Sequence, residues 1–229
     1  MLIKSEVMDS KLIANIVLLC IFVYAAVGNL MAWSFNKPLG VLLTKPLLMP
    51  VLAIYYVLNC FSVEYILVVA LLFAFLGDFF LIWPQKKIFF IGGLVFFLIM
   101  QLLYIVFITT KQVTPEMFSL PVMAAAIGFL IAGLFIYLNL YKSLKEMKIP
   151  VLVYMLVILT VGFLCFVNMI GNFNRCNLLE FLGALFFIVS DTILAFDSFK
   201  KPVNMANLWI MSTYINAQLF LFAGFMNTY

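Results

Sequence analysis

The sequence of 229 residues contains no histidine. This absence excludes the serine and cysteine triads that depend on histidine, together with zinc sites ligated by imidazole. Cysteine is scarce as well, and Cys20, Cys60, Cys165 and Cys176 have no Cys-x-x-Cys spacing, so neither a redox pair nor a thiolate metal site is indicated. No glycine-rich phosphate loop or dinucleotide fingerprint occurs. We therefore expect a protein that uses neither a metal nor a cofactor.

Charge is also scarce. Only 10% of the residues are charged, against about 25% in an ordinary globular domain, while 67% are hydrophobic. These are too few polar residues to cover the surface of a soluble fold. The apolar stretches are near the roughly 20 residues that a helix needs to cross a hydrocarbon core of about 30 Å. They are apolar on all sides rather than alternating, which predicts an all-α integral membrane protein forming one polytopic domain over residues 1–229.

Short polar breaks divide the chain into eight predicted transmembrane helices. Their expected ranges are 12–33, 43–60, 64–82, 88–109, 119–140, 151–171, 178–197 and 205–226. Most prolines lie at or beside the breaks, where the missing backbone N–H costs least. Pro46 and Pro50 lie inside the second span instead, which predicts a distorted, kinked entry to that helix.

The basic residues divide unevenly between the two sides that eight spans imply. Nine follow the odd-numbered spans: Lys37, Lys45, Lys86, Lys87, Lys142, Lys145, Lys148, Lys200 and Lys201. Four lie on the opposite side: Lys4, Lys11, Lys111 and Arg175. Because positive loops favour the cytoplasm, we expect both termini outside. Twelve lysines against one arginine favour a bacterial origin, and hence a bacterial cytoplasmic membrane. The net charge of +4 belongs to short membrane-flanking loops and calls for no nucleic-acid partner.

Two acidic residues lie well inside predicted spans. Asp78 occurs in Leu76-Gly77-Asp78-Phe79 and Asp191 in Val189-Ser190-Asp191-Thr192. A carboxyl group within a membrane helix costs several kcal/mol, so such residues are functional candidates by default. The structural alternative is a buried acid that only pairs with Lys45 or caps a broken helix.

The predicted depths of these acids agree with one another. At about 1.5 Å per residue, Asp78 would lie about 6 Å and Asp191 about 9 Å from the predicted cytoplasmic ends of their helices. Lys45 begins the second helix, which enters from the same side. We therefore expect the three charges to meet in one cavity that opens to the cytoplasmic leaflet.

Further polar residues suggest an internal duplication. Gly77-Asp78-x-x-Leu81 and Ser190-Asp191-x-x-Leu194 share a small-Asp-x-x-Leu pattern four helices apart. The helices that follow them each carry a Gln and a Tyr, namely Gln101 with Tyr104, and Tyr214 with Gln218. A four-plus-four duplication would explain both matches. We expect these four residues, with Asn216 and Ser190, to line a substrate site, and the alternative is hydrogen bonding between helices.

An ordered set of segments resembles the YhhN-like lysoplasmalogenases, from about residue 40 to the end of the chain. The segments are Thr44-Lys45-Pro46-Leu47-Leu48-Met49-Pro50, Leu76-Gly77-Asp78-Phe79-Phe80-Leu81, Gly183-Ala184-Leu185-Phe186-Phe187-Ile188-Val189-Ser190-Asp191-Thr192-Ile193-Leu194-Ala195 and Tyr214-x-x-Ala217-Gln218. The resemblance implies an eight-helix membrane fold. It also implies hydrolysis of the vinyl-ether bond of lysoplasmalogens to a fatty aldehyde and glycerophosphocholine or glycerophosphoethanolamine, with lysophospholipid and membrane lipids as partners.

The available side chains suit that reaction. Hydrolysis of a vinyl ether begins with protonation of its β-carbon, which generates an oxocarbenium ion that water then attacks. Two carboxyl groups in one low-dielectric site cannot both ionise easily, so one keeps a proton near neutral pH. We expect Asp78 and Asp191 to be that catalytic pair, in either order. Lys45 would bind the substrate phosphate or act on an aspartate.

The competing hypothesis is a proton-coupled transporter or carrier, because paired acids and internal repeats are common there too. Against it, Pro46 and Pro50 have no matching helix breakers in the sixth predicted helix. A lipid-binding or purely structural membrane protein is the third possibility.

Overall fold

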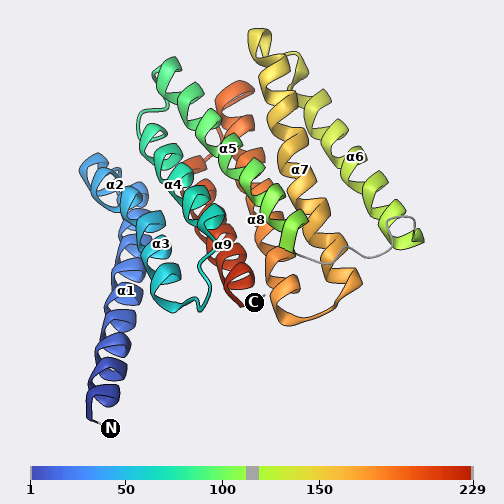
Figure 1. The fold of residues 1–229 in the computed structure, drawn as a ribbon. Coiled ribbons are helices and arrows are strands. Elements are labelled where there is room, and N and C mark those ends of the chain that lie inside the picture. Colours follow the sequence, from blue (N-terminus) through green and yellow to red (C-terminus); the bar gives the residue numbers. More distant parts are fainter. Residues whose placement is uncertain (1, 112–118, 228–229) are drawn as a thin grey trace. The chain divides into compact units, whose positions relative to one another are not determined.

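The computed structural model describes residues 2–111 and 119–227, and within these ranges the regular secondary structure is entirely helical. The helices are α1 (Leu2–Ser34), α2 (Pro38–Thr44), η1 (Lys45–Leu47), α3 (Leu48–Asn59), α4 (Tyr65–Phe80), α5 (Lys87–Lys111), α6 (Leu120–Tyr141), η2 (Lys145–Met147), α7 (Lys148–Gly171), α8 (Arg175–Phe199) and α9 (Ala206–Asn227), where η marks a 3-10 helix (Figure 1).

Each of the eight predicted spans coincides with an apolar helical segment. Seven of these segments, counted over the described residues, are long and apolar enough to cross a membrane. The eighth, α4, has 16 residues, fewer than the roughly 20 that a helix needs to cross the hydrocarbon core. The chain is therefore an all-helical integral membrane protein with seven to eight helices of spanning character.

The second span is broken where its prolines predict a distortion. It runs from Pro38 to Asn59 and contains α2, the 3-10 turn η1 and α3 in succession. Pro46 lacks an N–H group and cannot continue the α-helical hydrogen bonds of α2. The helix begins at Pro38 rather than at residue 43, which corrects the position of Lys45. This lysine lies seven residues inside the span, so it does not belong to the loops predicted to be cytoplasmic.

The chain divides into two compact units, Met1–Phe97 and Leu98–Tyr229, and the boundary falls within α5. An exact division into four and four helices would place the boundary between α5 and α6. The internal duplication therefore stays a prediction from the sequence.

Hydrogen bonds inside apolar surroundings tie the helices of the first unit together. In this unit α1 packs against α2 and α3, and α3 packs against α4 (Figure 1). The buried Asn29 of α1 donates from Nδ2 to Thr44 Oγ1 at 3.1 Å. Asn15 of α1 and Asn59 of α3 donate to each other at 2.8 Å. Such paired polar groups satisfy donors and acceptors that lipid could not.

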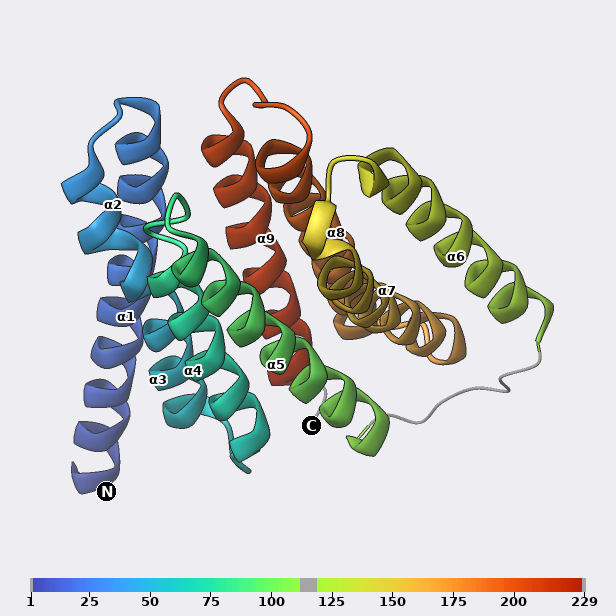
Figure 2. The same ribbon diagram turned by 90° about the horizontal axis from the view of Figure 1, so that it is seen from above.

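The second unit is built around α8, which packs most extensively along α9 and also along α7 (Figure 2). Gly183 permits the close approach of α8 and α9, because a Cβ atom there would lie 2.7 Å from the backbone nitrogen of Leu221. The α7–α8 connection is short, and Asn174 begins α8 by accepting a hydrogen bond from the backbone N–H of Asn177 at 2.9 Å. These contacts fix the face that α8 presents to each neighbour.

Candidate functional site

Lys45 and Asp78 form a buried ion pair in the first unit. The distance from Lys45 Nζ to Asp78 Oδ1 is 3.8 Å, and only 5% of Lys45 and 1% of Asp78 is exposed. The break at η1 places Lys45 at the point where α2 passes into α3, while Asp78 occupies the last turn of α4. Taking two charges out of water is costly, and their mutual attraction offsets part of that cost.

The second aspartate has a neutral partner. In the second unit, Tyr154 of α7 donates a hydrogen bond from its hydroxyl group to Asp191 Oδ2 of α8. Both side chains are half-buried, and the described residues of this unit place no cation against Asp191. The neighbouring Ser190 donates from Oγ to the carbonyl oxygen of Ile210 on α9 at 3.1 Å. Asp191 therefore lies at a junction of three helices, with a hydroxyl group rather than an ammonium group beside it.

Tyr154 is a residue that the sequence analysis did not single out. A signal for it exists, because α7 and α8 are antiparallel helices joined by a short turn. Residues equally distant from that turn then face each other, as Asn168 and Asn177 do, with Asn177 Nδ2 3.3 Å from the Asn168 carbonyl oxygen. The same spacing pairs Tyr154 with Asp191.

The depths of the two aspartates differ more than expected. Asp78 lies two residues before the end of α4 and Asp191 eight residues before the end of α8, or about 3 Å and 12 Å at 1.5 Å per residue. The difference arises because α4 ends at Phe80, two residues early, and α8 continues to Phe199. The aspartates lie in different units, so their meeting in one cavity stays a prediction.

Tyr104 and Gln218 are brought together in the second unit. Tyr104 Oη donates to Gln218 Oε1 at 3.0 Å, and both side chains are at most 2% exposed. Gln218 Nε2 in turn lies 3.3 Å from the sulfur of Met100. Gln101, one residue further along α5, is 1% exposed, and neither amide atom has a hydrogen-bond partner among the described residues. Such an unsatisfied buried amide is unusual and marks a position where a ligand or water could bind.

The two remaining candidates on α9 differ in their surroundings. Tyr214 is buried and packs edge-to-face against Phe187 of α8, with ring centroids 5.7 Å apart. Asn216 is exposed, and its Nδ2 donates to the Ser212 carbonyl oxygen of its own helix at 2.8 Å. The helical period turns Asn216 away from the face that carries Gln218.

Glu180 is a further buried acid, with 0% of its surface exposed. It was assigned to a helix end because the seventh span was expected to begin at residue 178, whereas α8 begins at Arg175. Gly224 of α9 makes room for it, since a Cβ atom there would lie 2.4 Å from Glu180 Cγ.

Over the described part of the chain, no three His, Cys, Asp or Glu side chains gather as a metal site would require.

The sequence profile of the YhhN family matches residues 40–225, which is most of the chain. The chain belongs to the YhhN family. This YhhN region contains the ion pair, the Tyr154–Asp191 pair and the Tyr104–Gln218 pair, whereas α1 lies outside it.

Curated relatives of this YhhN protein carry the name lysoplasmalogenase. The chain is 33% identical over 159 residues to human "Lysoplasmalogenase TMEM86A", 30% over 152 residues to human "Lysoplasmalogenase TMEM86B", and 32% over 160 residues to "Lysoplasmalogenase TMEM86A" of Bos taurus. The matches cover 66%, 66% and 67% of this chain and 61%, 59% and 62% of the relatives. The chain therefore spans about three fifths of the length of these relatives. No solved structure matches it.

Proposed function

We propose that the chain hydrolyses the vinyl-ether bond of lysoplasmalogens, releasing a fatty aldehyde and glycerophosphocholine or glycerophosphoethanolamine. The observation that carries the proposal is the pair of membrane-embedded carboxyl groups, Asp78 beside Lys45 and Asp191 beside Tyr154. Membership of the YhhN family and the names of the relatives support it. Acid-catalysed cleavage of a vinyl ether needs a positioned proton donor and a carboxylate, and the chain offers both.

The different partners suggest which carboxyl group has which role. Lys45 compensates a negative charge on Asp78, and so favours the carboxylate form of that residue. Asp191 faces a neutral hydroxyl group, and an uncompensated charge there would be costly in a low-dielectric environment. We therefore assign Asp191 as the proton donor and Asp78 as the carboxylate. In this assignment Lys45 pairs with Asp78 and does not bind the substrate phosphate.

The proposed reaction returns Asp78 and Asp191 to their starting protonation states. Asp191 protonates the β-carbon of the vinyl ether, and the double-bond electrons form the new C–H bond, leaving an oxocarbenium ion. Asp78 stabilises this cation and takes a proton from the water molecule that adds to it, which gives a hemiacetal. Asp191 then accepts the hemiacetal hydroxyl proton while Asp78 protonates the departing glycerol oxygen. One water molecule is consumed, and the products are aldehyde and alcohol.

The other candidate polar residues have proposed supporting roles. Gln101, with its unsatisfied amide, and the Tyr104–Gln218 pair would contact the glycerol part of the lipid. Tyr214 would contact the alkenyl chain, and Asn216 would meet membrane lipid from the exposed face of α9. Ser190 would act by holding α8 against α9. We place the protein in a bacterial cytoplasmic membrane with both termini outside, as the lysine distribution favours.

The test is aldehyde release by purified, detergent-solubilised protein from an alkenyl-lysophospholipid, with the saturated alkyl-ether analogue as control. We expect aldehyde from the vinyl ether alone, and a loss of about 10²–10⁴-fold in Asp191→Asn and in Asp78→Asn, the range typical of general acid–base groups. Glu146→Gln, in the exposed turn η2, also removes a carboxylate charge and is the matched control. Full turnover in either aspartate variant, with the protein monodisperse, would refute the assignment.

Glu180 provides an argument for the alternative, a proton-coupled carrier. Glu180 and Asp191 are eleven residues apart on α8, which is within about 20° of three full turns. Two acids on one helix face are typical of proton pathways through membranes. A carrier would release no aldehyde but would conduct protons in liposomes, and Glu180→Gln would abolish that flux.

A further inference from the structure

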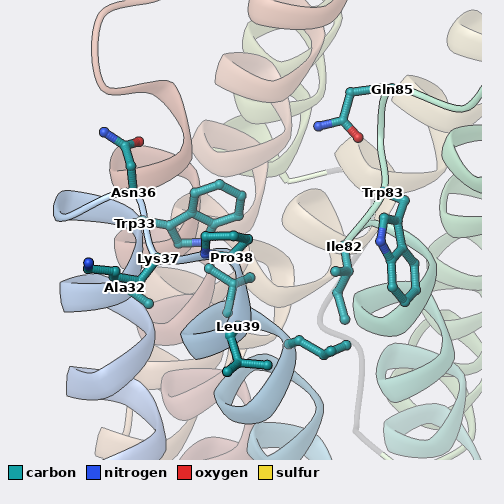
Figure 3. A pocket seen from close by; sticks show the side chains of 11 residues that line it. Ala32, Trp33, Asn36, Lys37, Pro38, Leu39, Ile82, Trp83 and Gln85 are labelled. Atoms are coloured by element: carbon teal, nitrogen blue, oxygen red, sulfur yellow. The ribbon is translucent and has the colours of Figure 1, made fainter.

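A cavity of about 410 Å³ lies in the first unit, between the α1–α2 connection and the segment that follows α4. Its volume falls within the range of about 300–1,000 Å³ typical of small-molecule sites. Figure 3 shows Trp33 and Pro38 on one side of it, with Ile82, Trp83 and Gln85 on the other. Most of its wall is apolar, and its polar side chains lie toward the helix ends.

The floor of the cavity lies next to the Lys45–Asp78 pair. Val41 lines the cavity and is one helical turn before Lys45, whose backbone N–H bonds to the Val41 carbonyl oxygen. Ile82 lines it from the other side and follows Asp78 by four residues. One turn corresponds to about 5.4 Å along a helix. The lining of the cavity therefore lies about one turn along the chain from each member of the ion pair that the proposed reaction uses.

The cavity is lined by the indole ring of Trp33. Trp33 Nε1 itself is buried and has no partner among the described residues. A ligand in the cavity therefore meets the ring of Trp33 rather than its N–H group. Trp33 precedes the region that matches the YhhN family, so this contact does not follow from family membership.

The charge around the cavity is of one sign. The exposed Lys37 lies among its lining residues, and Lys86 and Lys87 follow Gln85 in the sequence. Residues 35–44 and 81–87 contain no acid. An anionic group at the mouth would therefore meet only positive charge. The indole rings of Trp33 and Trp83 offer electron-rich faces, which attract ammonium groups.

We propose that this cavity binds the zwitterionic phosphate–ammonium head group of the lysophospholipid and so directs the ether end of its glycerol toward Asp78. The phosphate meets Lys37, while the ammonium group lies against the indole ring of Trp33. This inference rests on the proposed hydrolysis for the identity of the lipid. It adds a head-group site, formed partly by α1, to the catalytic groups.

Equilibrium binding to the full chain in nanodiscs tests the site without turnover. The two probes are a radiolabelled saturated 1-O-alkyl-lysophosphocholine, which has no vinyl ether, and the 1-O-alkylglycerol of the same chain length. In Trp33→Leu we expect the Kd of the lysophosphocholine to rise about tenfold, from a lost cation–π contact, with the Kd of the alkylglycerol unchanged. Trp33→Phe keeps an aromatic face and should lose about threefold. Lys37→Gln should also raise the Kd of the lysophosphocholine about threefold.

The chain contains a matched tryptophan control. Trp209 of α9 is 55% exposed and is not one of the residues that line the cavity, so Trp209→Leu should leave both Kd values unchanged. Lys142→Gln, in another exposed loop, serves the same purpose for Lys37. An unchanged lysophosphocholine Kd in folded Trp33→Leu would overturn the proposal. A parallel rise for both probes would also overturn it, because the cavity would then hold the alkyl chain.

Aldehyde release from the alkenyl lipid, measured on the same samples, separates this site from the proposed reaction. Head-group-selective binding without any aldehyde would support the cavity and refute the hydrolase. Aldehyde release by the wild type, with no difference between the two probes in Trp33→Leu, would refute the cavity and leave the hydrolase standing.

Discussion

The two membrane aspartates, Asp78 and Asp191, each have a polar partner on the preceding segment, but the partners differ in charge. In the first unit, Asp78 of α4 pairs with Lys45, which belongs to the apolar segment just before α4. In the second unit, Asp191 of α8 accepts a hydrogen bond from Tyr154 of α7, the helix just before α8. Each partner lies near the beginning of its own segment. A shared layout of this kind is what a duplication would leave, although the sequence match is only a few residues long.

The difference between the partners matters more than the likeness. An ammonium group stabilises a carboxylate at all pH values where lysine is charged, whereas a phenol hydroxyl adds no charge. Gly77 and Ser190, the small residues that precede the two aspartates, also have different structural roles. A Cβ atom at Gly77 would lie 2.9 Å from the Phe97 ring, while Ser190 donates a hydrogen bond to α9. The first unit therefore gives its acid a charged partner, whereas the second gives its acid a neutral hydrogen-bond donor.

The largest effect is expected from breaking the charged pair. Lys45→Met keeps the approximate length of the side chain and removes its charge, so the buried Asp78 loses its lysine partner. Breaking a buried pair in this way costs about 3–5 kcal/mol, so the melting temperature in detergent should fall steeply and turnover with it. The exposed Lys142→Met is the control.

A double variant separates stability from chemistry at the same site. Lys45→Met with Asp78→Asn removes both charges and should recover most of the lost melting temperature, because no charge is left unpaired. Turnover should not recover, since the carboxylate is gone. A single Lys45→Met variant with wild-type melting temperature would show that the pair contributes nothing to the fold.

A smaller effect is expected at the neutral pair. Tyr154→Phe retains the ring and removes only the hydroxyl group that donates to Asp191. The loss of one hydrogen bond costs about 0.5–1.5 kcal/mol, so unfolding should change little while turnover falls about tenfold through a misplaced acid. Tyr137→Phe on α6, whose hydroxyl lies 3.4 Å from the Lys148 carbonyl oxygen, is the control. A fall in melting temperature as large as that of Lys45→Met would contradict the view that the neutral pair contributes less to stability than the charged pair.

Much of the fold follows from hydropathy, because in a membrane each helix satisfies its own backbone and must be apolar along its length. All eight predicted spans correspond to apolar helices, and Pro46 and Pro50 correctly predict the broken entry to the second. Hydropathy predicts the positions of helix ends less well. Hydropathy does not distinguish a polar residue in the first turn from one in a loop, so Lys45 and Glu180 were placed at or beyond helix ends although both are buried.

The partners of the candidate residues are harder to predict than the residues themselves. Aspartate in an apolar run is conspicuous, and both Asp78 and Asp191 stand out for that reason. Tyrosine is common in membrane helices, so Tyr154 has no such signal until the register of α7 against α8 is known. Asn216 shows the opposite problem, since its polarity attracts attention although its side chain bonds only to its own helix.

The smallest effect is expected at Ser190, whose polarity and position beside Asp191 led us to place it at the substrate. Its hydroxyl instead donates to the Ile210 carbonyl oxygen, which also accepts from Thr213 Oγ1 at 3.1 Å. Ser190→Ala therefore leaves that acceptor satisfied, and the cost should be about 0.6 kcal/mol, as for an average hydrogen bond between membrane helices. Turnover should stay within about twofold of wild type, since about 0.4 kcal/mol of barrier corresponds to that factor. A fall in turnover beyond tenfold at unchanged melting temperature would mean that the Ser190 hydroxyl touches the substrate. The residue before Asp191 would then offer the substrate a polar contact that Gly77, before Asp78, cannot.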